Sequence, residues 1–92
     1  MNYLHYELDL GSDELVEVDL DKQANVRLMD EPNFTLYKRG QRHRYFGGLA
    51  TQSPLHLKAP HPGRWHLVVD LGGFAGQVKA AVKTLKNVPQ EV

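Results

Sequence analysis

The sequence predicts a mainly β fold: a two-sheet antiparallel sandwich or partly open barrel with one short helix near residues 32–39. Three runs of alternating apolar and polar residues recur about every ten residues near the N-terminus, which is typical of short sandwich strands. The densest β-branched run lies between Gly63 and Gly73 and has one wholly apolar face, as expected of a central strand. Helix signals replace the alternation most clearly after Asp30.

Length and composition bound the class of protein. The 92 residues give room for one core, so we expect a single β domain over residues 1–86 and a frayed C-terminal tail over residues 87–92. The chain has no cysteine, which excludes a disulfide framework, thiolate metal sites and cysteine catalysis and favours a cytoplasmic location. No apolar run is long enough to span a membrane, and the first residues lack the pattern of a signal peptide.

The first three strands are expected over residues 3–10, 15–20 and 24–29. In the first strand the alternation separates two faces. One face is apolar, with Leu4, Tyr6, Leu8 and Leu10, and the other carries Tyr3, His5, Glu7 and Asp9.

The period changes after the third strand. Asp30 can cap a helix, Pro32 suits its first turn and Gly40 suits its end. Phe34 and Tyr37 would then lie on one side of the helix and hold it against the sheet.

A strand over residues 45–50 contains Gly47 and Gly48, which indicates a bulge or a close approach of two backbones. A short strand follows over residues 55–58. The central strand then places Trp65 on its apolar face with Leu67, Val69 and Leu71. Its opposite face carries His66, Val68 and Asp70.

The C-terminal segment, residues 77–86, fits two structures. A helical stripe is formed by Val78, Ala81, Val82 and Leu85. A strand would instead turn inward Val78, Ala80, Val82 and Thr84.

Several motifs resemble a small bacterial family of unknown function, the one numbered 1883, over nearly the whole chain. The matching segments are Ala24 to Asp30, Arg42-His43-Arg44-Tyr45-x-Gly47-Gly48, and Gly63-x-Trp65-His66-x-Val68-Val69-Asp70-Leu71-Gly72-Gly73-x-Ala75-Gly76. The resemblance implies a mostly β domain that stands alone or precedes a TIR-type signalling domain, for which this chain has no room. It implies a strand at residues 77–85, but no reaction, cofactor or catalytic residue.

Charge is distributed unevenly along the chain. Residues 1–31 carry nine acids and two bases, whereas residues 32–66 carry six bases and no acid. Such asymmetry can mark a polar binding face, but we favour the interpretation that strands of the acidic part pair with the basic part and the fields cancel.

The strongest candidate site is the basic-aromatic loop, residues 38–45. Arginine binds phosphate or carboxylate in a bidentate way, and aromatic rings stack on bases. The candidate ligand-binding residues are Lys38, Arg39, Arg42, His43, Arg44 and Tyr45. The alternative is a solvated loop whose aromatic residues anchor the core and whose arginines pair with Glu14, Glu17 or Asp19.

The leading functional hypothesis is a small non-catalytic bacterial binding or interaction module that presents this loop to an anionic partner. That partner is unidentified: a nucleotide-like small molecule, a nucleic acid or an acidic protein surface fits. One alternative is a small hydrolase or transferase that uses His43 or His66. Another is a structural or oligomerising domain in which an exposed edge strand pairs with a second copy.

Metal and cofactor sites are not predicted. His56, His61 and His66 lie five residues apart and do not converge on extended strands. His66 and Asp70 lie about 13 Å apart along one strand, too far for an acid–base dyad. Residues 72–76 follow a strand as a phosphate loop does, but they lack the full motif, and we expect a glycine-rich hairpin connection instead.

Overall fold

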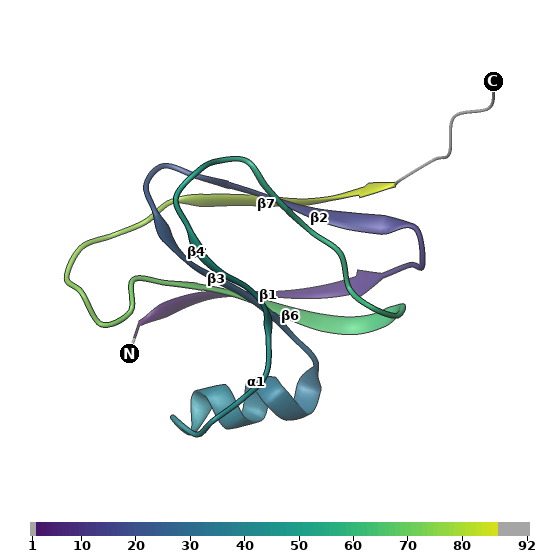
Figure 1. Cartoon of the computed structure of the whole chain (residues 1–92), viewed down its shortest axis with the longest axis horizontal. Coiled ribbons are helices and arrows are strands. Elements are labelled where there is room, and N and C mark those ends of the chain that lie inside the picture. The colour runs from purple at the N-terminus through teal and green to yellow at the C-terminus, as the bar shows by residue number, and fades with distance from the viewer. Residues whose placement is uncertain (1, 87–92) are drawn as a thin grey trace.

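The computed structural model of the chain describes residues 2–86, so the tail expected over residues 87–92 lies outside the described residues (Figure 1). The elements follow the predicted order. They are β1 (Tyr3–Leu10), β2 (Glu14–Leu20), β3 (Ala24–Met29), α1 (Glu31–Lys38), β4 (Phe46–Ala50), β5 (Leu55–Leu57), β6 (Gly63–Asp70) and β7 (Ala80–Lys86).

The strands form two antiparallel sheets that lie one above the other (Figure 1). The larger sheet has the order β1-β6-β3-β4, and the smaller has the order β5-β2-β7. The two sheets do not join into a barrel, so the prediction of a mainly β sandwich with one short helix is confirmed.

The central position of β6 is also confirmed. It pairs with β1 on one side and with β3 on the other. Trp65, Leu67 and Val69 of its inner face are almost completely buried and join the main core. The smaller sheet contributes Val16 and Val18 to the same core. Burial of this apolar surface is the main force that holds the two sheets together.

Helix α1 packs on the outer face of the larger sheet, on the side away from the smaller sheet (Figure 1). The Asp30 side chain caps it by accepting a 3.1 Å hydrogen bond from the backbone N–H of Asn33. Phe34 and Tyr37 are buried against Val68, as the helical spacing predicts. The helix ends before Gly40, which adopts a positive φ of 68°.

Of the two glycines in β4, Gly47 lies where a side chain would collide with the neighbouring strand. It lies opposite Arg27 of β3 with a φ of 117°, and a Cβ atom there would lie 2.2 Å from the Val26 carbonyl oxygen. The predicted close approach of two backbones is therefore present, since only glycine fits this space.

The prediction of a glycine-rich hairpin connection at residues 72–76 is wrong, as the path of residues 71–79 shows. They connect β6 to β7, which lie in different sheets, so the glycine-rich segment crosses between the sheets and is not a hairpin.

Strand β7 confirms the strand interpretation of the C-terminal segment. Val78, Ala80 and Val82 pack against the core, but Thr84 is exposed although it lies opposite the buried Val16.

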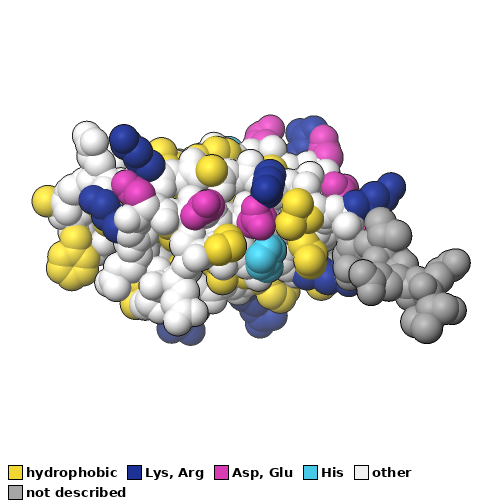
Figure 2. All heavy atoms as spheres, turned by 90° about the horizontal axis from the view of Figure 1, so that it is seen from above, with side chains coloured by type: hydrophobic (Ala, Val, Ile, Leu, Met, Phe, Trp, Pro, Cys, Tyr) yellow, Lys and Arg dark blue, Asp and Glu magenta, His cyan; other side chains and the backbone are white. Residues whose placement is uncertain are grey.

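The outer face of the smaller sheet carries charges of both signs (Figure 2). Glu17 accepts hydrogen bonds from His56 and Lys83, each at 3.1 Å. Lys83 lies outside residues 32–66, so its contact with Glu17 is not the pairing expected between the acidic and basic parts. Arg64 and Asp9, 3.6 Å apart, are a pair of the expected kind. No helix within residues 2–86 has the length and hydropathy of a membrane span.

Candidate functional site

The polar residues of interest lie on the outer face of the larger sheet, beside helix α1. Alternation along β6 turns His66, Val68 and Asp70 to this face, as predicted. The helix covers Val68, and both polar residues are buried, with His66 1% exposed and Asp70 2% exposed. Each therefore needs hydrogen-bond partners, because an unpaired polar group in the interior is costly.

Asp70 obtains its partners from four directions. Asn25 donates to it at 3.0 Å, the Tyr37 hydroxyl at 2.8 Å and the backbone N–H of Gly72 at 2.8 Å. Arg27 completes the set through a short ion pair with the same carboxylate.

These contacts change two pKa values in opposite directions. Burial alone would raise the pKa of Asp70, but the hydrogen bonds from Asn25 and Tyr37 help to hold it below its ordinary value. Burial and the Asp70 carboxylate raise the pKa of Tyr37, so its hydroxyl stays protonated and acts as the donor. We conclude that Asp70 is a structural anion.

Arg27 connects this network to the basic-aromatic loop. Its guanidinium carbon lies 5.6 Å from the centre of the Tyr37 ring and 5.1 Å from the centre of the Tyr45 ring. The His43 ring meets Tyr37 edge-on at 5.3 Å and lies 5.5 Å from Tyr45. His43 and Tyr45 therefore have a packing role beside any role in binding.

The structure divides the six predicted site residues. Lys38 is on α1 with its Nζ 4.7 Å from the centre of the Phe34 ring, and it does not line the groove described next. Arg39 is the C-cap residue of α1 and is exposed. Arg42 is exposed and lies just outside the groove described next. His43, Arg44 and Tyr45 remain together.

An open groove of about 570 Å³ lies where β3 ends and β4 begins. The three loop residues line one side of it, and the backbone N–H of Arg44 donates a 2.8 Å hydrogen bond to Asn33. The remaining lining residues are Leu28, Met29, Asp30, Asn33, Phe46, Pro60, His61 and Trp65. One guanidinium and several aromatic rings thus border a space of the size that holds small ligands.

The two ring nitrogens of His43, which lines this groove, have different surroundings. Its Nδ1 lies 2.9 Å from the Gln41 carbonyl oxygen, whereas its Nε2 is buried and has no hydrogen-bond partner within the described residues. Because this nitrogen is buried, it does not form part of the open surface of the groove.

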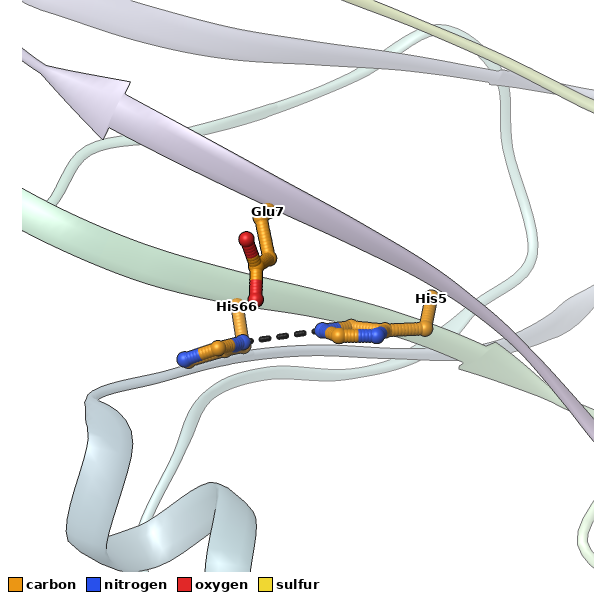
Figure 3. Close-up of side chains that lie close together, drawn as sticks. All are labelled: His5, Glu7 and His66. Carbon is orange, nitrogen blue, oxygen red and sulfur yellow. Dashed lines mark hydrogen bonds between the residues drawn. The ribbon is translucent and has the colours of Figure 1, made fainter.

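A second cluster lies on the same outer face, at β1. His5 Nε2 and His66 Nδ1 are 2.8 Å apart, and Glu7 approaches the same point (Figure 3). The other ring nitrogen of His66 contacts the Glu31 carboxylate at the start of α1. Because a carboxylate only accepts, His66 Nε2–H is the donor. In a neutral His66 ring, Nδ1 is then the acceptor for His5 Nε2–H.

The pKa shifts in this cluster favour a neutral His5 and an ionised Glu31. Burial and the neighbouring His66 lower the pKa of His5, and the hydrogen bond from His66 lowers the pKa of Glu31. The sequence analysis missed this cluster. Alternation placed His5 and Glu7 on one face, but only the pairing of β1 with β6 brings His66 to them.

Comparison with known proteins yields one match. The sequence model of the family described as Domain of unknown function (DUF1883) matches residues 1–88. No curated protein and no solved structure matches the chain.

Proposed function

The chain belongs to the family described as Domain of unknown function (DUF1883), and since that description names no activity we propose a function from the geometry of the site. The protein is a small non-catalytic binding module. It uses the basic-aromatic loop, residues 38–45, and the adjoining groove to bind an anionic ligand.

The observation that carries this proposal is that the positively charged side chains of the loop are not paired with acidic side chains of the described residues. Within residues 2–86, no salt bridge involves Lys38, Arg39, Arg42 or Arg44, and none of them reaches Glu14, Glu17 or Asp19. Asp70 is already paired with Arg27, and Asp30, which lines the groove, accepts hydrogen bonds from Asn33. Unpaired guanidinium groups beside a groove are typical of sites that receive phosphate or carboxylate.

The groove favours a small ligand with a planar ring. Arg44 supplies the positive charge, and Tyr45 is 42% exposed, so part of its ring is accessible. An anionic group on Arg44 with a ring against Tyr45 is the arrangement of a nucleotide, which we take as the first ligand to test.

The catalytic alternative has less support. Within the described residues, His43 contacts a carbonyl oxygen, and His66 contacts His5 and Glu31. Neither histidine is hydrogen-bonded to a hydroxyl group that would serve as a nucleophile.

The test compares two double variants that each remove two positive charges. Arg42→Ala with Arg44→Ala alters the loop, whereas Lys22→Ala with Lys79→Ala alters exposed residues that do not line the groove. AMP, ATP and a single-stranded oligonucleotide are titrated against each by calorimetry at several salt concentrations. We expect the loop variant to bind at least tenfold more weakly, which corresponds to about 1.4 kcal/mol.

For the oligonucleotide, the log–log salt slope should fall by about one for each lost phosphate contact. Equal losses in both double variants would show that only net charge matters and would contradict the proposal. Binding to an acidic protein surface, with none to the nucleotides, would retain the loop as a site but replace the ligand.

A further inference from the structure

The cluster at β1 brings together three side chains that are metal ligands in other contexts. His5 and Glu7 are two residues apart on β1 and so share a face of the sheet. Glu7 lies directly opposite His66 of β6 in the strand register, and His5 lies diagonal to it. One ligand atom from each of the three lies within 4.8 Å of the other two (Figure 3).

His66 is fixed in the orientation that a metal ligand needs. Its ring stacks on Phe34 with centroids 4.4 Å apart, and it is 1% exposed. The Glu31 carboxylate accepts its Nε2–H and leaves the Nδ1 lone pair directed to His5. A carboxylate on the remote ring nitrogen of a ligating histidine is the usual outer contact of such sites.

Small adjustments would open room for an ion. Two nitrogens bound to tetrahedral Zn²⁺ at 2.0–2.1 Å lie about 3.3 Å apart, whereas His5 Nε2 and His66 Nδ1 are 2.8 Å apart. His5 is exposed, so its ring can shift by about 0.5 Å. Exchange with solvent can replace its Nε2 proton by one on Nδ1, which frees Nε2 without changing the charge of the ring.

We propose that His5, Glu7 and His66 bind a divalent transition-metal ion, with Zn²⁺ as the expected occupant. Two imidazoles and one carboxylate form a donor set that suits Zn²⁺ and its neighbours in the first row. Because three protein ligands fill three of four positions and both β1 ligands are exposed, the remaining position faces solvent. This proposal departs from the prediction of no metal site, whose spacing argument weighed only His56, His61 and His66 and not the pairing of β1 with β6.

The experiment uses the full chain purified without a histidine tag, treated with EDTA and freed of the chelator. Zn²⁺ is titrated by calorimetry, and Co²⁺ is titrated by visible absorbance, since tetrahedral Co²⁺ has strong d–d bands. We expect one equivalent of either ion and a melting temperature that rises with Zn²⁺ concentration by mass action.

The variants are chosen among exposed residues, so that folding is retained. His5→Ala and Glu7→Gln should each weaken Zn²⁺ binding at least tenfold, and Glu31→Gln should weaken it about 10–100-fold by releasing His66. His56→Ala removes an exposed histidine on the other sheet and is the matched control, with unchanged affinity and stoichiometry.

Two results would overturn the proposal. One is a stripped wild-type protein that takes up no Zn²⁺ or Co²⁺ at micromolar concentrations. The other is binding that survives in His5→Ala and Glu7→Gln but is lost in His56→Ala. The double variant of Arg42 and Arg44 should bind Zn²⁺ normally, so this result is independent of the nucleotide titrations.

Discussion

The hydroxyl of Tyr37, on α1, donates a 2.8 Å hydrogen bond to the buried carboxylate of Asp70, at the end of β6. Tyr37 therefore holds the helix to the sheet in two ways: its hydroxyl binds Asp70, and its ring packs in the apolar cluster with Val68. Tyr37→Phe keeps the ring and removes only the hydroxyl. We expect a loss of about 1.5–3 kcal/mol in the free energy of unfolding, measured by urea denaturation, because the acceptor is charged.

Asp70→Asn should cost more, about 3–5 kcal/mol, because it leaves Arg27 beside a neutral group. The pKa of Asp70 is lowered in the folded state, so its ionisation stabilises the fold above about pH 4. This stability is lost as the pH falls through the folded pKa. Asp70→Asn should therefore flatten the acid limb of the stability–pH curve.

The matched control is Asp9→Asn. Asp9 and Arg64 lie 3.6 Å apart, but their side chains are 82% and 60% exposed, so this pair should contribute little. An acid limb that is equally steep in wild type and Asp70→Asn would contradict the assignment of Asp70.

Much of the fold was predictable because each strand carries its own signal. Alternation identified the inner face of β6, and Asp30 with Gly40 bounded the helix. Strand pairing was not predictable, because a period of two shows which residues share a face and not which strands are neighbours. For that reason residues 72–76 were wrongly expected to form a hairpin connection.

The candidate sites show the same limit. Composition identified the basic-aromatic loop, but Lys38 turns to Phe34 because the two are four residues apart on a helix. That separation was readable from the sequence. The approach of His5 to His66 was not, since 61 positions separate them and only the β1–β6 register brings them together.

Trp65→Ala tests the core assignment of the central strand. The indole is 2% exposed, and its Nε1–H donates a 3.1 Å hydrogen bond to the His61 carbonyl oxygen. We expect a loss of about 3–5 kcal/mol by urea denaturation, because the substitution leaves a cavity. Phe74→Ala is the control, since Phe74 is 83% exposed and its loss should change stability by less than about 0.5 kcal/mol.

Comparison of Gly47→Ala with Gly48→Ala separates two causes of lost stability: collision of the new Cβ atom with the neighbouring strand, and strain from a positive φ angle. Both glycines have positive φ values, 117° and 141°. A Cβ atom at Gly47 meets the Val26 carbonyl oxygen, whereas one at Gly48 meets no atom within 4 Å. Strain alone costs about 1–3 kcal/mol, so we expect Gly47→Ala to lose clearly more stability than Gly48→Ala. Equal melting temperatures would contradict the close approach of β3 and β4.

Tyr45 allows packing and ligand binding to be separated. Its ring lies 5.1 Å from the Arg27 guanidinium carbon and is also 42% exposed at the groove. Tyr45→Phe keeps the ring over Arg27, so stability and nucleotide affinity should both stay near wild type. Tyr45→Ala removes the ring and should cost about 0.5–1 kcal/mol of stability from the lost cation–π contact.

If the ring also stacks on a bound base, Tyr45→Ala should lower nucleotide affinity by a further 1–3 kcal/mol per stacked base. That loss should be larger for AMP than for inorganic phosphate, which has no ring. A loss of stability with unchanged AMP affinity would show that Tyr45 only covers Arg27. Arg44 would then be left as the principal ligand contact in the groove, because Arg42 lies outside it.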